Sequence, residues 1–445
     1  MLQNRIVALF LATAAVAAPS VAQRAGNAPQ YFPPPNVWEH RTPAQVGLNA
    51  KAVSDAVALA MGAESSINKD LLEAHRSSFG REPFGEAIGP FRSPRGGVAG
   101  LIIKNGYIVA EWGDPDRVDQ TYSVTKSFVT TTIGLAFDRK MIANLNDAVY
   151  KYMPPILALK GAPAAGGALV PVPATVVGTA NTKTDAAPPS NIVAFNAFEM
   201  IEPFESEHNR KITWGHLLRQ TSEWQGTLWG KPDWADRPPR GMDIEQFKSR
   251  ARPEPGSTYT YNDVRVNLMA LASLMVWRRP LPQVLKEHVM DPIGASNSWR
   301  WYGYDNSWIV LDGQLVQSVA GGAHWGGGLI INSKDMARFG LLTLRNGRWN
   351  GKQILSEAWL KMATTPGPAK SDYGFANFFL NTGTKAANAD TVIRQVPSAP
   401  VTAFYHLGNG NNIIYVDRQN DLVIVARWMN NLRTLDGMVK LLLAK

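Results

Sequence analysis

Two pairs of predicted β-strands stand at opposite ends of this 445-residue chain, with mainly helical sequence between them. Near the start, the β-rich run 98–104 is followed by Asn105-Gly106 and by a return run at 107–112. Asn-Gly is typical of a two-residue type I′ turn, so this segment predicts a β-hairpin. Near the end, the runs 413–416 and 422–428 predict a second strand pair. If both pairs belong to one antiparallel sheet, the two ends of the chain form one domain and the middle of the chain forms another.

Helical patterns fit this division. Apolar residues recur at helical spacing over residues 50–62, and a second helix is expected over 123–137. An apolar strand-like run at 329–331 leads to Ser333, which is expected to cap a helix that reaches residue 344. A final helix is expected from about Thr434. These helices would cover the sheet and fill the middle region.

The expected fold class is therefore α+β, with an antiparallel sheet flanked by terminal helices and a mostly helical domain. We expect residues 45–122 and 335–445 to form the α/β domain, and residues 123–334 to form the helical one. Residues 155–193 are dominated by Ala, Pro, Gly, Thr and Val, which predicts an irregular insertion. Residues 23–44, rich in Pro, Asn and Gln, are expected to be an extended lead-in.

The first 22 residues have the pattern of an export signal. Arg5 is their only charge, an apolar run occupies residues 6–18, and Pro19-Ser20-Val21-Ala22 is a small-residue cleavage pattern. The apolar run is shorter than the roughly 20 residues that span a bilayer. We expect cleavage after Ala22, a periplasmic or secreted mature protein, and no stable membrane anchor after cleavage.

Composition and missing motifs exclude several kinds of chemistry. There is no cysteine, which rules out disulfides, thiolate metal sites, iron–sulfur clusters and cysteine nucleophiles. The net charge is +9, but the basic residues are scattered, so no nucleic-acid partner is expected. The histidines are not at metal-ligand spacing, and the motifs G-x-S-x-G and H-E-x-x-H are absent. We therefore expect no metal and no cofactor.

The most informative segment is Ser123-Val124-Thr125-Lys126, which opens an apolar helix after the hairpin. On a helix, Ser123 and Lys126 share a face, and a partly desolvated lysine can activate a serine hydroxyl as a nucleophile. The same spacing occurs at Ser66 and Lys69, but that copy lies in a polar stretch where a solvated turn is expected. The alternative for Ser123 is a helix cap with Lys126 as a solvated charge.

Further segments resemble the serine β-lactamase and penicillin-binding-protein superfamily, and most closely its class C branch with the family VIII esterases and 6-aminohexanoate-dimer hydrolases. The resemblance covers residues 40–445 apart from the insertion. It rests on Ser123-x-x-Lys126, the segment 212–222, Pro255-Gly256 before Tyr261-Asn262-Asp263, the segment 334–340, and His406-Leu407-Gly408. It implies a β-lactamase-like (transpeptidase) fold and a serine acyl-enzyme.

Tyr261 corresponds to the tyrosine of the family's second motif, Tyr-x-Asn, and the resemblance implies that it shuttles a proton between nucleophile and leaving group. Tyr259 is expected to pack or to line the pocket. Asp263 stands where the family usually has Asn, and a carboxylate near Lys126 would favour the charged ammonium. Lys126 is then either the base or a fixed positive charge that lowers the pKa of Tyr261. Asp263 is also a candidate contact for a cationic substrate group.

Two segments match the third motif, Lys-Thr-Gly or His-x-Gly. His406-Leu407-Gly408 precedes the last strand pair, as in the family, and is preferred over His324-Trp325-Gly326. The resemblance then assigns the oxyanion hole to the backbone N–H groups of Ser123 and Asn409, and substrate contacts to His406 and Gly408. His324 is expected in a loop or in the pocket wall. A mostly neutral His406 would lack the cation that anchors a β-lactam carboxylate, which favours ester or amide substrates.

Three tryptophans, Trp224, Trp229 and Trp234, cluster after the segment 212–222, and the first two are candidates for an aromatic substrate pocket. The sequence thus predicts a secreted serine hydrolase that cleaves a small-molecule ester or amide, with Ser123, Lys126 and Tyr261 as catalytic residues. Two alternatives remain open. One is a β-lactamase or D,D-peptidase on the same scaffold, and the other is a non-catalytic ligand-binding or sensor module.

Overall fold

The computed structural model describes residues 30–160, 198–239, 241, 243–385 and 391–444. Within these ranges, residues from Tyr31 onward form one compact unit. The predicted signal segment and most of the predicted insertion lie outside the described residues. No helix in the described ranges is long and apolar enough to cross a membrane.

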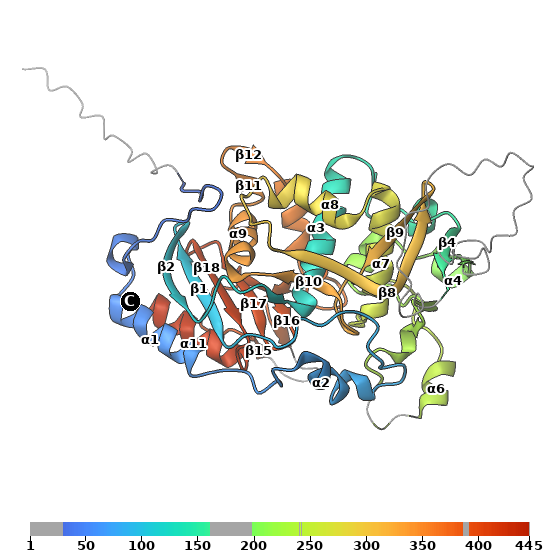
Figure 1. Ribbon diagram of the computed structural model, residues 1–445, viewed down its shortest axis with the longest axis horizontal. Coiled ribbons are helices and arrows are strands. Elements are labelled where there is room, and N and C mark those ends of the chain that lie inside the picture. Colours follow the sequence, from blue (N-terminus) through green and yellow to red (C-terminus); the bar gives the residue numbers. More distant parts are fainter. Residues whose placement is uncertain (1–29, 161–197, 240, 242, 386–390, 445) are drawn as a thin grey trace, which may run out of the picture. The chain divides into compact units, whose positions relative to one another are not determined.

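The main sheet joins the two ends of the chain, as the sequence predicts (Figure 1). Its six antiparallel strands have the order β13-β16-β17-β18-β1-β2. Ile102 in β1 lies opposite Ile424 in β18, so the N-terminal hairpin pairs directly with the C-terminal one. The bounds are β1 (Ala99–Lys104), β2 (Tyr107–Trp112), β13 (Phe379–Leu380), β16 (Phe404–Gly408), β17 (Asn412–Asp417) and β18 (Leu422–Arg427).

The turn between β1 and β2 has the predicted chemistry. Asn105 and Gly106 have φ values of 55° and 89°, so both lie in the left-handed region that a type I′ turn requires. This turn matches the right-handed twist of the flanking strands, which is why the pair forms a tight hairpin.

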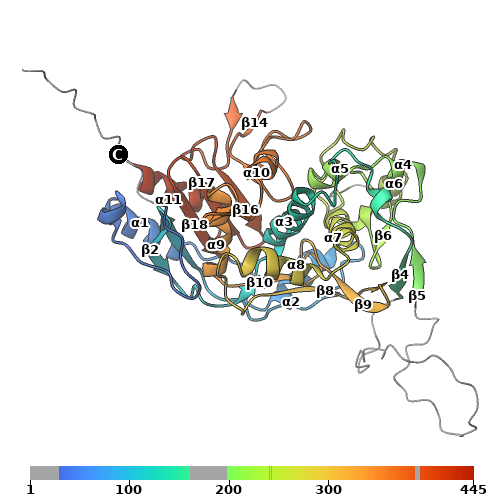
Figure 2. The same cartoon turned by 90° about the horizontal axis from the view of Figure 1, so that it is seen from above.

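Helices cover both faces of the main sheet. On one face lie α1 (Ala50–Met61) and α11 (Leu432–Leu443), side by side in Figures 1 and 2, and their apolar residues share a buried cluster with Tyr415 and Ile424. On the other face lies α9 (Ser333–Leu344), whose Phe339 belongs to a second buried cluster with Ile414 and Val423. All residues of β17 and β18 are buried because both faces are covered.

The N-terminal cap of α9 lies one residue before the predicted one. Ser333 begins α9, but the residue that caps it is Asn332, whose side chain accepts a hydrogen bond from the Asp335 N–H at 2.7 Å. Asn and Ser both favour the cap position, so the sequence alone did not separate two adjacent candidates.

The middle of the chain contains a second sheet that the sequence did not predict. Its path is β3-β10-β8-β4-β5, and β9 also pairs with β8. The strand β4 lies inside the segment predicted to be an irregular insertion, so the prediction was wrong for that part. The bounds are β3 (Asp119–Gln120), β4 (Ile156–Leu159), β5 (Phe198–Ile201), β8 (Arg300–Leu311), β9 (Gln314–Val319) and β10 (Gly328–Ile331).

Arg427 ties the two sheets together. It lies at the end of β18 and donates to the carbonyl of Gln120 in β3 and to that of Ile331 next to α9, each at 2.8 Å. Burial lowers the pKa of this guanidinium to about 10, yet it remains charged at neutral pH. The sheets therefore meet beside the start of the segment that contains Ser123.

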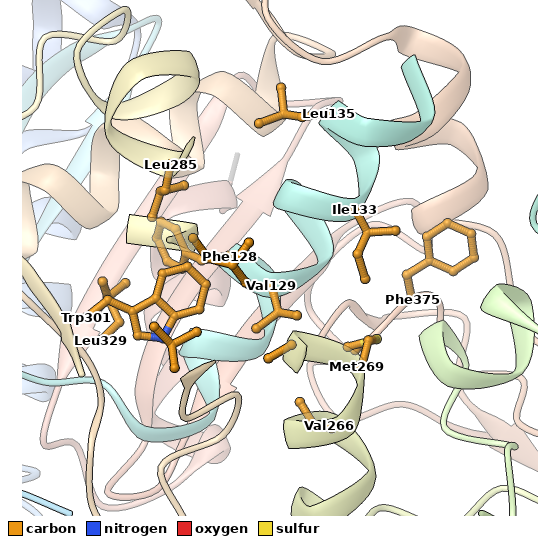
Figure 3. Close-up of a cluster of buried hydrophobic side chains, with 14 of the residues drawn as sticks. Phe128, Val129, Ile133, Leu135, Val266, Met269, Leu285, Trp301, Leu329 and Phe375 are labelled. Atoms are coloured by element: carbon orange, nitrogen blue, oxygen red, sulfur yellow. The ribbon is translucent and has the colours of Figure 1, made fainter. Parts of the chain in front are cut away.

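Helices α3 (Thr125–Asp138) and α7 (Asp263–Trp277) form the centre of the middle region. Figure 2 shows α3 between β16 and α7. Nearly every residue of both helices is buried, and Figure 3 shows their apolar side chains meeting those of the second sheet. The remaining α-helices of the described ranges are α2 (Leu71–Arg76), α4 (Glu207–Arg210), α5 (Trp214–Leu218), α6 (Ile244–Ser249), α8 (Leu281–Leu285) and α10 (Glu357–Ala363).

The packing around α3 predicts a large effect of truncation. Phe128 is fully buried and stacks on Phe339 with ring centroids 4.3 Å apart. Phe128→Ala is expected to lower the free energy of unfolding by about 3–5 kcal/mol, measured by denaturant titration. The matched control is Phe84→Ala, because Phe84 is 46% exposed, and we expect its loss to be under about 1 kcal/mol. Equal losses for the two variants would contradict this description of the core.

Candidate active site

Ser123 lies in η3 (Tyr122–Val124), the single turn that joins β3 to α3, and is 9% exposed. The preceding Tyr122 has φ 50°, which is an unusual conformation for a bulky residue. Thr121 holds the turn in place, because its N–H and its hydroxyl both donate to the Leu329 carbonyl of β10. The second sheet therefore positions Ser123.

Lys126 reaches Ser123 from the first turn of α3. Its Nζ donates to Ser123 Oγ at 2.7 Å and to Asp263 Oδ1 at 2.6 Å, and its side chain is fully buried. Burial lowers the pKa of Lys126, although the Asp263 carboxylate opposes that effect. The spacing predicted from the sequence therefore places the amine in direct contact with the serine hydroxyl.

Asp263 is the first residue of α7, and it is fully buried between two cations. Its second oxygen, Oδ2, lies 2.6 Å from Nη1 of Arg237. Burial alone would raise the pKa of the Asp263 carboxyl, but Lys126 and Arg237 outweigh it and hold that pKa well below its usual range. Because Asp263 has no exposed surface, it offers no contact to a cationic substrate group in this geometry.

Tyr261 lies between the same two cations. The Lys126 ammonium is 4.7 Å from the centroid of its ring, and the Arg237 guanidinium is 5.1 Å from it. Burial and the charge of Asp263 raise the pKa of Tyr261, while Arg237 and the nearby Ser123 hydroxyl partly offset that rise. The phenol is thus protonated at neutral pH. Tyr259 lies farther out, with its ring against that of Tyr373 at 4.9 Å.

The strand β16 borders Ser123 through Gly408. A Cβ on Gly408 would lie 1.9 Å from the Thr121 carbonyl oxygen and 3.3 Å from the Ser123 nitrogen, so only glycine allows this approach. Asn409 follows directly, and the resemblance assigned its N–H to the oxyanion hole. The structure therefore brings the third-motif strand that ends in Gly408 next to Ser123.

His406 is farther from the surface than the sequence suggested. It is fully buried, and its Nδ1 lies 2.8 Å from Ser127 Oγ and 3.2 Å from the Asn377 carbonyl. Burial lowers the pKa of His406 to about 3, so the ring is neutral at neutral pH. His406 thus contacts Ser127 of α3 and has no exposed surface that could bind a substrate.

His324 lies in the loop between β9 and β10, and it is also buried. Its Nε2 is 2.8 Å from Glu82 Oε2 and 3.5 Å from Asp236 Oδ1, while Nδ1 is 3.9 Å from Asp263 Oδ2. Glu82, Asp236 and His324 place possible metal-ligand atoms within 4.8 Å of one another. The Arg237 guanidinium pairs with Asp236 at 2.5 Å, so one of these three side chains already has a cationic partner.

The two candidate pocket tryptophans are packing residues in this geometry. Trp224 is 2% exposed and donates from Nε1 to the Pro203 carbonyl at 2.6 Å. Trp229 is 7% exposed, and its carbonyl accepts a hydrogen bond from Asn306. Both rings lie in the large buried cluster of the middle region, together with apolar side chains of α7.

Sequence reasoning missed several residues that surround Lys126 and Tyr261. Arg237 and Asp236 lie in a Trp- and Pro-rich loop, and Tyr373 lies after α10, far from any motif. Gly322 is equally close, since a Cβ there would collide with Asp263 Oδ1 and Lys126 Nζ. The adjacent Asp236-Arg237 pair was visible in the sequence, but nothing placed it opposite Asp263.

The family model for β-lactamases matches residues 86–434, so the chain belongs to the Beta-lactamase family and has its hydrolase scaffold. Among solved structures, the chain is similar to a β-lactamase from Sulfitobacter sp. EE-36, at 15% identity and TM-score 0.50 over 91% of this chain and 99% of that one. It is also similar to a β-lactamase/D-alanine carboxypeptidase from Pseudomonas syringae, at 15% identity and TM-score 0.46 over 79% and 94%. A third match is EstCE1, a hydrolase with promiscuous acyltransferase activity, at 16% identity and TM-score 0.48 over 88% and 98%.

Comparison with curated protein sequences finds no match. The resemblance and the α+β fold class predicted from the sequence are confirmed by the family match and by the Sulfitobacter structure. At this level of identity the structural likeness shows the fold alone.

The buried ion pair predicts that alanine substitutions of two aspartates lower the free energy of unfolding by very different amounts. Asp263→Ala leaves Lys126 and Arg237 without their shared carboxylate, and we expect it to lower the free energy of unfolding by about 3–5 kcal/mol. The matched control is Asp55→Ala, because Asp55 pairs with Lys51 at the same 2.6 Å but on the exposed surface. Its expected loss is about 0–1 kcal/mol. Denaturant titration measures both, and a small loss for Asp263→Ala would refute the charged, buried pair.

His406 predicts a pH dependence of stability. Its folded pKa, about 3, lies below the unfolded value of about 6.5. Between those values only the unfolded state binds the proton, so stability is highest above pH 6.5 and falls as pH decreases toward 3. Relative to His406→Gln, the wild type should lose up to about 1.4 kcal/mol per pH unit in this window. Parallel denaturation curves of the two proteins from pH 7 to 4 test this, and identical slopes would contradict it.

Proposed function

We propose that this protein is a serine hydrolase that cleaves a carboxylic ester or an amide through an acyl-enzyme on Ser123. The observation that carries the proposal is the 2.7 Å contact between Lys126 Nζ and Ser123 Oγ, beside Tyr261. A nucleophile in contact with a lysine, and a second proton-transfer group at the same oxygen, is the arrangement that activates a serine.

The proposed reaction has two stages. Ser123 Oγ attacks the carbonyl carbon, and its proton passes to Lys126 Nζ. The oxyanion forms beside the N–H groups of Ser123 and Asn409. The C–O or C–N bond then breaks, the leaving group takes a proton from the Tyr261 hydroxyl, and the Lys126 proton restores the phenol. Water then attacks the acyl carbon and releases the acid and free Ser123.

The pKa directions support this division of roles between Lys126 and Tyr261. Burial lowers the pKa of Lys126, which makes the neutral amine more accessible. Burial raises the pKa of Tyr261, which keeps the phenol protonated and suits a proton donor. We therefore assign the base role to Lys126 and the acid role to Tyr261.

The surroundings of the third motif support an ester or amide over a β-lactam. His406 is neutral and enclosed, so it supplies no cation for a β-lactam carboxylate. We also propose that the mature protein begins after Ala22 and works in the periplasm or outside the cell on a small-molecule substrate. The signal-like sequence of residues 1–22 is the support for that location.

A serine substitution tests the proposed reaction. Ser123→Ala is expected to lower kcat/KM for a short-chain p-nitrophenyl ester by about a thousandfold or more, because no other hydroxyl takes its place. The matched control is Ser66→Ala, which changes the exposed second copy of the Ser-x-x-Lys pattern and should keep full activity. Mass spectrometry of a protein stopped during turnover should find the acyl group on the peptide containing Ser123.

The alternatives give different results. Acylation of Ser123 by a penicillin, with no ester or amide turnover, would replace the proposal with a β-lactamase or D,D-peptidase. Equal activity in wild type and Ser123→Ala would refute Ser123 as the nucleophile. Inertness to every acylating probe would favour a ligand-binding or sensor module.

A further inference from the structure

The aspartate at position 263 creates a chemical problem for the proposed base. Its carboxylate lies 2.6 Å from Lys126 Nζ, with both side chains fully buried. An isolated buried pair of this kind favours the ammonium, because removing the proton would leave the carboxylate without a partner. An ammonium cannot accept the proton of Ser123. A further group must therefore reduce the extent to which Asp263 stabilises the protonated form of Lys126.

Arg237 is placed to reduce the effect of Asp263 on Lys126. Its Nη1 lies 2.6 Å from Asp263 Oδ2, the oxygen that Lys126 does not contact. The same nitrogen lies 2.5 Å from Asp236 Oδ1, and the guanidinium faces the ring of Tyr261. Burial lowers the pKa of Arg237, but Asp236 and Asp263 outweigh that effect and raise it above its ordinary value. Arg237 is therefore a permanent positive charge.

We propose that Arg237 is a positioning residue that shares the carboxylate of Asp263 with Lys126, so that Lys126 can exist as the neutral amine that accepts the Ser123 proton. The inference rests on the proposed function. With Arg237 present, deprotonated Lys126 leaves Asp263 paired and no carboxylate without a counter-ion. Without Arg237, deprotonation of Lys126 would leave the Asp263 carboxylate with no permanently charged counter-ion, because Lys126 contacts Oδ1 and His324 lies 3.9 Å from Oδ2.

The charges around Lys126 support this account. The titratable and charged groups around the Lys126–Asp263 pair are Tyr261 before α7, Asp236 and Arg237 after η6 (Asp233–Ala235), His324 between β9 and β10, and Tyr373 after α10. Arg237 is the permanent cation in this group, and it offsets one of two carboxylates. Gly322 closes the remaining side of the pair, because a side chain there would collide with both Lys126 and Asp263.

A set of pH profiles tests the proposal. The acid limb of kcat/KM reports the pKa of the base in the free enzyme. Arg237→Gln is expected to move this limb to higher pH by about one unit or more, because loss of the nearby positive charge raises the pKa of Lys126. On the limb, each pH unit of this displacement lowers kcat/KM about tenfold. Asp263→Asn is expected to move the limb down, because the amide no longer favours the ammonium. The double variant should return the limb toward the wild-type position.

Two further variants separate charge from local structure. Arg237→Lys keeps a cation, and its acid limb should stay near that of the wild type. Arg81→Gln removes a positive charge from the exposed end of η2 (Phe79–Arg81), outside the site, and should not move the limb. Thermal melting of each variant shows whether it is folded.

Two results would overturn the proposal. One is an unchanged acid limb in a folded Arg237→Gln variant. The other is an Asp263→Asn variant whose acid limb does not move to lower pH, a result that stays decisive even when Arg237→Gln does not fold. Failure of the proposed function would look different, because Ser123→Ala would then be as active as the wild type. An inactive Ser123→Ala with unmoved limbs would overturn the role of Arg237 alone.

Discussion

The buried contact of Lys126 with Asp263 is the interaction on which the site depends. Burying either charge alone costs several kcal/mol, so the fold must hold both helices that carry them in a fixed position. Lys126 sits at the start of α3 and Asp263 at the start of α7, and almost every residue of these helices is buried. The large apolar core around these helices therefore holds a buried polar centre in a fixed position.

Ser123 lies where the two sheets meet. Thr121 ties the turn that precedes Ser123 to the second sheet, and Gly408 at the end of β16 brings the main sheet against the same turn. Arg427 connects the two sheets a short distance away. The serine is thus held by backbone from both sheets, and the proposed acyl transfer would need such a fixed position through both of its stages.

Local signals in the sequence predicted local structure well. The turn at Asn105-Gly106, the helix after Ser123 and the strand pair at the end of the chain each depend on neighbouring residues. Sequence patterns did not predict the structure where the pairing or packing partner lies far away in the chain. The strand β4 reads as a breaker-rich insertion because its pairing partners, β5 and β8, lie elsewhere in the chain. Trp224 and Trp229 look like pocket residues in a sequence, but packing in the large apolar cluster buries them.

The sequence by itself determined the Ser123–Lys126 contact, because helical spacing places residues three apart on one face. It also determined the family and the hairpins of the main sheet. Only the tertiary structure decided how Asp263 is used. Its carboxylate has two cationic partners, and one of them, Arg237, comes from a loop with no periodic pattern and no motif. Spacing along a chain specifies neighbours on one element, whereas the charge balance of a buried site depends on which distant loops close over it.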